Sequence, residues 1–334
     1  LDKTEKILYN IEHPEDAYIP YREKIAHIQE LLNNTELLIG FNLKFDLHWL
    51  RRYGINVPHD LSLWDCQIAH YVKSSQQVFY PSLNEVCTYY KHPQKIDNVK
   101  VNYWDKGIDT DKVPWVELSE YLDGDLQATE AVYLSQQEDS AFNVTSKKRK
   151  LLQISCTDLL TLEEMEWNGL PYDTTTSRSL AAEITIKVAD IDNQLNDLIS
   201  SSVPLNYASN DDKSILLYGG SIDVVSSSPY TKKDGTTSLS RTIKTTRKYI
   251  FPALCKAPPN SALKKAGYWS TDEGTLKKIR CTGKPKRLIT LLLSRAKLIR
   301  LGSTYYEGLP KLMESMGWGD TIHGSLNQCA TITG

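Results

Sequence analysis

Two short segments in the first part of the chain combine carboxylates with a hydroxyl group that could take part in hydrolytic chemistry. Asp46 lies in FNLKFDLHWL, residues 41–50, which follow an apolar run and open a predicted helix. Tyr121 and Asp125 are four residues apart, so they share one face if residues 114–133 form a helix. Hydrolysis of a phosphodiester by two metal ions needs several carboxylates that converge on hard cations, and a nearby hydroxyl can orient the attacking water. Asp46, Asp125 and Tyr121 are our candidates for these roles.

The Tyr-x-x-x-Asp spacing is weak evidence when taken alone. It occurs three more times in the sequence, at Tyr207/Asp211, Tyr230/Asp234 and Tyr268/Asp272. Those copies lie in basic or loop-rich surroundings, whereas Tyr121 and Asp125 lie on a long predicted amphipathic helix in the same acidic region as Asp46. We therefore favour the pair at 121 and 125. For Asp46 a simpler interpretation is that an aspartate in the first turn of a helix favours the helix dipole.

Other polar side chains have structural interpretations. Asn42 is placed to cap the helix that contains Asp46, and Asp65 precedes an apolar helical run as an N-cap, although Asp65 could also add a carboxylate to the site. The 7 histidines have no paired spacing typical of a metal site, and the 6 cysteines form no Cys-x-x-Cys pair. We expect reduced, mostly buried thiols and no histidine or cysteine metal site.

Charge divides the chain into two regions of opposite sign. The net charge is −2, but residues 1–140 hold 13 Lys and Arg against 23 Asp and Glu, and residues 141–334 hold 26 against 18. Residues 211–300 have 19 basic and 6 acidic side chains, a surplus that could neutralise a phosphate backbone or form only a solvated face. The length predicts two or three domains. The sequence has neither a membrane span nor an export signal, which predicts a cytoplasmic protein.

The apolar pattern predicts the elements that must position these residues. Residues 6–10 and 36–41 are β-like runs among amphipathic helical segments, which indicates an α/β or α+β domain over the first 140 residues. Apolar residues at helical spacing over 151–165 and 180–198, with a break at 168–169, predict two antiparallel helices joined by a turn. Residues 218–270 are typical of loops or a small β excursion, and a strong helix is predicted over 286–306.

The segments around Asp46 and Tyr121 together resemble a known exonuclease family. Residues 40–46 (GFNLKFD), followed by Tyr121-x-x-x-Asp125, are similar to the second and third motifs of the DEDD superfamily in its tyrosine branch. That branch includes the proofreading domains of family A DNA polymerases and RNase D-like RNA exonucleases. The resemblance implies an α/β, ribonuclease H-like domain: a mixed sheet flanked by helices, with its first strand missing. It also implies that Asp46 and Asp125 bind Mg2+ or Mn2+, that Tyr121 positions the water, and that Asn42 and Phe45 contact the substrate.

The second half of the chain resembles the thumb of family A polymerases, the DNA polymerase I-like enzymes, and of their phage branch in particular. Residues 300–310 (RLGSTYYEGLP) are similar to the thumb motif, and residues 322–334 (IHGSLNQCATITG) to the entry into the palm. The resemblance implies an exonuclease domain over 1–140, a mainly α-helical thumb with a helical linker over 141–320, and the beginning of the palm over 321–334. The family's arginine before the Ser-Thr-Tyr motif would fall at Ala296, one place after Arg295. The DNA contacts that we expect are Lys284, Lys286, Arg287, Arg295, Arg300, Ser303 and Thr304.

The first exonuclease motif of this family, Asp-x-Glu, has no counterpart before Asp46. The resemblance then implies that two of four metal-binding carboxylates, and the catalytic residues of the polymerase, are absent. We therefore expect a polymerase fragment with little or no nuclease activity. Its partners would be a single-stranded primer 3' end, primer-template duplex DNA and phage replication proteins, in a phage-infected bacterial cell. Two alternatives stay open, a catalytically inactive DNA-binding clamp and an RNase D-like RNA exonuclease.

Overall fold

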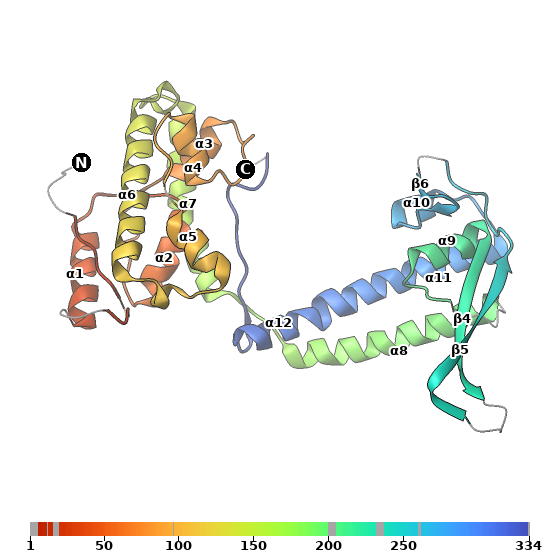
Figure 1. Ribbon diagram of the computed structural model, residues 1–334. Helices are drawn as coiled ribbons and strands as arrows, with labels where there is room; N and C mark the ends of the chain where they lie inside the picture. Colours follow the sequence, from red (N-terminus) through yellow and green to blue (C-terminus); the bar gives the residue numbers. More distant parts are fainter. Residues whose placement is uncertain are drawn as a thin grey trace. The chain divides into compact units, whose positions relative to one another are not determined.

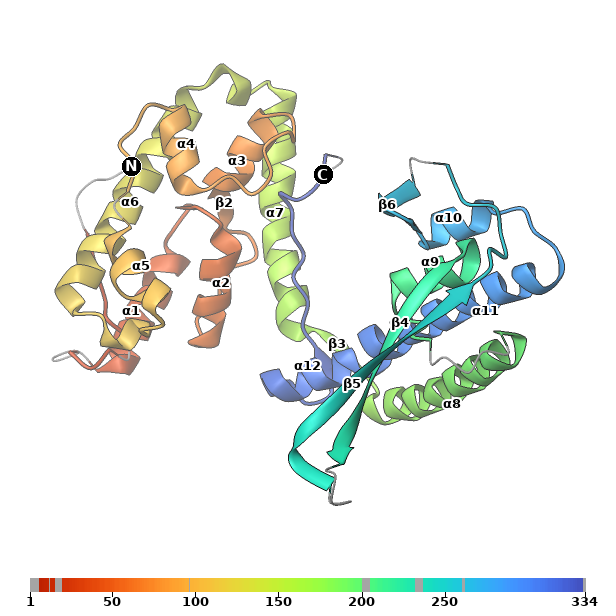
Figure 2. The same ribbon diagram turned by 45° about the vertical axis from the view of Figure 1, so that its right-hand side comes forward.

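The chain folds into two compact units in the computed structural model, which describes residues 6–11, 13–15, 20–95, 97–199, 205–231, 237–259 and 262–332. The first unit is Leu1–Leu170 with His323–Gly334, and the second is Pro171–Ile322; their elements are labelled in Figure 1 and Figure 2. No helix in the described part of the chain is long and apolar enough to cross a bilayer.

The first unit is a set of helices around a short parallel sheet. Strands β1 (Leu37–Gly40) and β2 (Ser62–Asp65) pair in parallel, with Leu37 opposite Ser62 and Gly40 opposite Asp65. The predicted α/β class is therefore confirmed for this unit. Its helical elements are α1 (Tyr21–Asn33), α2 (Leu43–Arg52), α3 (Cys66–Lys73), α4 (Leu83–Tyr89), α5 (Asn98–Asn102), η1 (Trp104–Lys106), η2 (Thr110–Lys112), α6 (Trp115–Glu138), η3 (Ser140–Phe142) and α7 (Lys147–Asn168).

Helix α7 belongs to the core of the first unit because it packs on α2, α3 and β2. Leu47 of α2 and Leu152 of α7 are 1% exposed and lie in one apolar cluster. Gln136 is fully buried but keeps its hydrogen bonds: it accepts one from the Trp64 indole at 2.9 Å and donates one to the Cys66 carbonyl at 2.9 Å. All 6 cysteines are free thiols, and all but Cys281 are buried, as the sequence predicted.

The predicted strand at residues 6–10 is wrong, because these residues form neither strand nor helix. Side chains attach the segment to neighbouring helices: Lys6 pairs with Asp123 of α6, and the Tyr9 hydroxyl bonds to the His27 ring of α1. These contacts take the place of a strand partner.

The second unit is built on two long helices and a long hairpin. Figures 1 and 2 show α8 (Thr174–Ile199) and α11 (Gly283–Arg300) lying side by side. Strands β4 (Gly220–Thr231) and β5 (Thr237–Phe251) pair antiparallel, so the β excursion that the sequence allowed within 218–270 is a long hairpin, with a register shift between Pro229 and Thr231. The other elements are β3 (Leu170–Pro171) at the start of the unit, α9 (Asn210–Tyr218), β6 (Leu263–Lys265), β7 (Tyr268–Trp269), α10 (Glu273–Lys278), η5 (Leu301–Tyr306), α12 (Gly308–Met316) and β8 (Thr321–Ile322).

The helix predicted over 286–306 changes its winding before its end. It is α-helical over Gly283–Arg300 and continues as a π-helical segment over Leu301–Tyr306. Gly302 lies so close to α8 that a Cβ there would be 3.2 Å from Ile184 Cγ2. The wider π winding places this glycine against α8 and leaves Ser303 and Thr304 exposed.

Candidate active site and nucleic-acid surface

Asp65 organises the backbone around the candidate site. It is 1% exposed, and its Oδ1 accepts hydrogen bonds from the amides of Gln67 (2.8 Å) and Ile68 (3.1 Å), as predicted for an N-cap. Its Oδ2 accepts a further bond from the Leu43 amide at 2.8 Å, at the start of α2. Asp65 therefore caps two helices, and one of them carries Asp46.

The predicted capping role of Asn42 is wrong. Asn42 does occupy the N-cap position of α2, but in the left-handed conformation (φ 61°, ψ 49°) and without a side-chain capping bond. Its own amide lies 3.3 Å from Asp65 Oδ1. The carboxylate from β2 thus does what the sequence assigned to Asn42, which leaves the exposed Asn42 side chain free of the cap.

Asp46 stands in the first turn of α2 beside two other carboxylates. Desolvation by the surrounding protein, together with the charges of Asp65 and Asp125, raises the pKa of Asp46 from 3.8 to about 7. The structure thus brings Asp46 and Asp125 within electrostatic reach of one another, although they are far apart in sequence. A site where carboxylates raise each other's pKa is one that favours a bound cation.

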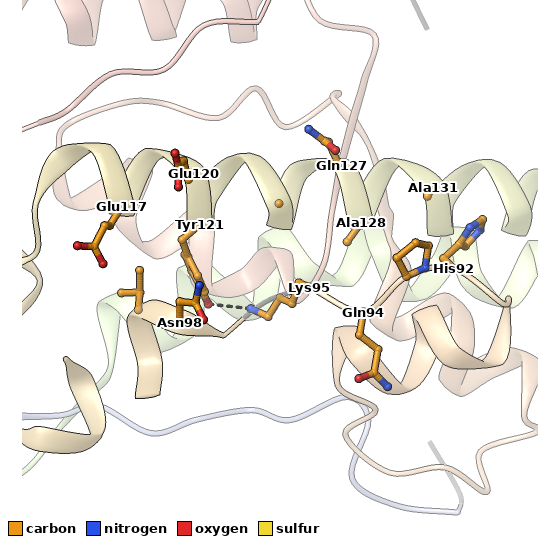
Figure 3. Close-up of a pocket in the computed structure, with 13 residues that line it drawn as sticks. His92, Gln94, Lys95, Asn98, Glu117, Glu120, Tyr121, Gln127, Ala128 and Ala131 are labelled. Carbon is orange, nitrogen blue, oxygen red and sulfur yellow. Dashed lines mark hydrogen bonds between the residues drawn. The ribbon is translucent and has the colours of Figure 1, made fainter. Parts of the chain in front are cut away.

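Tyr121 and Asp125 share one face of α6, as predicted, and both meet a lysine that the sequence analysis did not single out. Lys95 Nζ lies 2.7 Å from the Tyr121 hydroxyl and 2.9 Å from Asp125 Oδ1. Desolvation raises the pKa of Tyr121, and the hydrogen bond from Lys95 opposes this rise. Figure 3 shows Lys95 reaching Tyr121 from the segment that follows His92. No spacing rule pointed to Lys95, because its place depends on how the loop before α5 folds.

A cavity of about 430 Å³ adjoins Lys95 and Tyr121. Its walls come from α6, α5 and the segment before α5, and Figure 3 shows Glu117, Glu120 and Asn98 among the side chains around it. Asp46 and Asp125 are not part of its wall. The cavity therefore lies beside the carboxylates rather than between them.

The candidate carboxylates Asp46 and Asp125 suffice for one divalent ion. No group of three or more His, Cys, Asp or Glu in the described residues is arranged to hold a metal ion. The Asp65 oxygens are already taken by backbone amides. Of the carboxylates that the sequence singled out, Asp46 and Asp125 remain. Mg2+ is commonly held by one or two carboxylates, with water and substrate phosphate completing its coordination. Asp46 and Asp125 meet that requirement for one ion.

The expected DNA contacts differ in how accessible they are. Lys284, Lys286, Arg287 and Arg300 are exposed on α11, and Ser303 and Thr304 are exposed on η5. Arg295 is engaged elsewhere: its Nε lies 2.6 Å from Asp192 Oδ1 of α8, and its side chain is only 14% exposed. Arg295 therefore ties α11 to α8 and is poorly placed to reach a phosphate.

A larger cavity of about 1030 Å³ lies between α9, α10, α11 and the β6–β7 hairpin of the second unit. Lysines and an arginine from four elements line it, namely Lys213, Lys264, Lys277, Lys297 and Arg300. Asp211, Asp272 and Glu273 also line it, so its charge is mixed. Of these cations the sequence analysis named only Arg300 as a contact, although all belong to the basic stretch that it identified.

Removing the charge of Asp46 should stabilise the first unit above neutral pH. The folded chain retains a proton on Asp46 up to about pH 7, whereas the unfolded chain loses it near 3.8, so the stability linked to this proton is lost as the pH rises through about 7. Although desolvation raises its pKa, Asp46 as a whole is exposed, and screening by solvent reduces the effect on stability. For Asp46→Asn we expect a gain of about 1 kcal/mol in the free energy of unfolding, or about 2–4 °C in Tm, at about pH 8. Thermal unfolding at about pH 4 should show little difference. An equal shift at both pH values would contradict the assignment.

Comparison with known proteins gives the chain its relatives. Residues 3–133 match the family described as 3'-5' exonuclease, of the DNA polymerase A exonuclease type. Among solved structures, the chain is similar to "POL domain of Pol1 from M. smegmatis complex with DNA primer-template and dNTP", with a TM-score of 0.56 and 16% identity. The alignment covers 92% of this chain and 43% of that one, so the chain spans less than half of that structure. No curated protein matches the sequence. At this identity the likeness is one of fold, and it agrees with the predicted fold class.

Proposed function

We propose that this chain is part of a family A DNA polymerase. Residues 3–133 match a 3'-5' exonuclease family, and the fold is similar to that of a polymerase. Its first unit would hydrolyse the 3'-terminal phosphodiester of a primer during proofreading, and its second unit would be the thumb that holds primer-template DNA. The observation that carries this proposal is the convergence of Asp46, Tyr121 and Asp125 from α2 and α6. A phage polymerase, with phage replication proteins as partners, is our more specific proposal and rests on the sequence resemblance.

In this proposal Asp46 and Asp125 hold a divalent cation, Mg2+ or Mn2+. Such an ion, when bound, polarises the phosphate and lowers the pKa of water that it binds. The Tyr121 hydroxyl would orient the attacking water. Phe45, which is 59% exposed, lies one residue before Asp46, with its ring centroid 6.3 Å from that of Trp49. A base at the frayed 3' end could stack on this exposed ring, and such stacking contributes about 1–3 kcal/mol per base without sequence preference.

The proposed thumb would bind the DNA backbone through the exposed cations of α11, with Ser303 and Thr304 of η5 as neutral hydrogen-bond donors. The charge surplus of residues 211–300 supports this role, since Lys and Arg neutralise phosphates without reading the sequence. Specificity would then depend on a free 3' terminus. The thumb as proposed covers the second unit, and α7 would be the linker that leads into it.

The test is release of nucleotides from a 5'-labelled single strand by the 334-residue chain with Mn2+. We expect little shortening from the 3' end, and what shortening occurs should depend on Mn2+ and fall at least tenfold in Asp125→Ala. Asp109→Ala is the matched control, because the Asp109 side chain is 79% exposed, does not line the cavity and stands on the loop between η1 and η2. Equal rates for both variants would contradict the hydrolytic role of Asp125.

A second candidate is a DNA-binding clamp without hydrolysis. The ion pair between Lys95 and Asp125 favours it, because an engaged carboxylate is a weaker metal ligand. DNA binding without any metal-dependent shortening would support this candidate. The third alternative, an RNA exonuclease, predicts that structured RNA competes better than primer-template duplex for the chain; we expect the duplex to win.

A further inference from the structure

The ammonium group of Lys95 is surrounded by oxygen atoms at the centre of the candidate site. Both oxygens of Asp125 lie near Nζ, at 2.9 and 3.2 Å, the Tyr121 hydroxyl lies at 2.7 Å, and Asp97 Oδ1 at 3.4 Å. Three carboxylate oxygens and a phenol oxygen thus converge on one positive charge. Oxygen ligands of this kind are those that Mg2+ and Mn2+ prefer.

We infer that Lys95 is the built-in cation of this site. Its ammonium group takes the place of one of the two divalent ions that two-metal hydrolysis requires, so the chain binds a single ion at Asp46 and Asp125. The inference rests on the proposed function, because it concerns the metal requirement of the same carboxylates. It makes Lys95 a positioning residue, which acts through Asp125 and Tyr121.

The position of Lys95 is fixed by the fold. Its amide donates a hydrogen bond to Asn84 Oδ1 of α4 at 2.9 Å, which sets the start of its side chain. The side chain is 18% exposed, and the ammonium group also lies over the Tyr121 ring, 4.6 Å from its centroid. Attachment at both ends keeps the cation in place without a ligand.

The charges explain why a fixed cation would limit metal binding. Asp125 offers both oxygens to Lys95, so a divalent ion that takes the same oxygens must displace the ammonium group or share them with it. The repulsion between Lys95 and a divalent ion grows as the two come closer. It is therefore stronger for a second ion at the Asp125 oxygens next to Nζ than for an ion on the Asp46 side. When Asp46, Asp97 and Asp125 are ionised, they carry a net charge of −2 together with Lys95, which one divalent ion balances.

The inference is tested by counting Mn2+ ions bound to the full chain, with free Mn2+ measured by electron paramagnetic resonance. We expect one ion at the site in the parent. Lys95→Met should bind a second ion, or the first at least tenfold more tightly, and Lys95→Arg should behave like the parent. The matched control is Lys100→Met, because Lys100 is an exposed lysine of α5. A second change, Asp125→Asn in the Lys95→Met chain, should remove the gain.

A gain of Mn2+ binding is a result that structural damage cannot produce, because a loosened site binds metal more weakly. Unchanged or weaker binding by Lys95→Met would overturn the inference, and so would the absence of Mn2+ binding in both chains. The outcome is separate from that of the proposed function. A gain of Mn2+ without nuclease activity would support the role of Lys95 and contradict hydrolysis. Metal-dependent nuclease activity of the parent, with unchanged Mn2+ binding in Lys95→Met, would support hydrolysis and contradict the role of Lys95.

Discussion

Asp65→Ala should lower the stability of the first unit by about 2–4 kcal/mol, the largest effect that we expect from one substitution in this chain. The change removes a buried acceptor that serves the amides of Leu43, Gln67 and Ile68. Each of two helices loses a cap, a cost of about 1 kcal/mol each, and the buried amides are left without a partner, which costs more. The methyl group of alanine offers these amides no hydrogen-bond acceptor.

Hydrogen exchange followed by mass spectrometry measures this effect in the place where it arises. Peptides that cover α2 and α3 should exchange faster in Asp65→Ala, because their opening free energy falls with the loss of the caps. Asp65→Asn keeps one carbonyl oxygen and should lose about half as much. Asp60→Ala removes an exposed aspartate before β2 and should leave the same peptides unchanged. Equal protection in Asp65→Ala and Asp60→Ala would show that the caps contribute little.

The second capping role of Asp65 and the position of Lys95 are the parts of the site that could not be predicted from the sequence. Asp46, Tyr121 and Asp125 could be chosen because helical spacing and a family motif single them out before any fold is known. The capping of α3 by Asp65 is local, and it was predicted. Its second role, capping α2, requires that β1 and β2 pair in register, so that Asp65 lies opposite Gly40. The position of Lys95 likewise depends on the hydrogen bond that its amide donates to Asn84 of α4, which no local pattern encodes.

The same distinction applies to the fold. Helix α11 was predicted because leucines at helical spacing mark its buried side, where Leu288 and Leu292 are at most 3% exposed. Its π-helical end was not predicted, since the winding goes together with a close approach of Gly302 to Ile184 on another helix, which no local pattern shows. Residues 218–270 were read as loops or a small β excursion, because Ser and Thr are the most frequent residues of β4 and β5. The apolar alternation at Ile222/Val224 and Tyr249/Phe251, which pack on the core, is too short to reveal the full length of the strands.

The other large effect that we expect concerns the cations at the start of α11. Lys284 and Lys286 lie in its first turn and Arg287 directly after it, where the helix dipole makes a positive charge unfavourable by about 0.3–1 kcal/mol each at an exposed position. No acidic residue stands in that turn to compensate. Their neutral replacement should therefore not destabilise the helix. An anionic partner such as a DNA phosphate, which the same helix terminus attracts, gives a physical reason for cations there.

Replacing all three by alanine should weaken binding of primer-template DNA roughly 30- to 100-fold at moderate salt and reduce the salt dependence by about three units of log Kd against log salt. Arg295→Ala also removes a positive charge from α11, but this charge already forms an ion pair with Asp192. It should lower stability by about 1–3 kcal/mol and change the salt slope by less than one unit. Fluorescence anisotropy over a salt series separates these results. If Arg295→Ala changed the slope as much as the triple replacement, the loss would reflect net charge alone and not phosphate contacts at the start of α11.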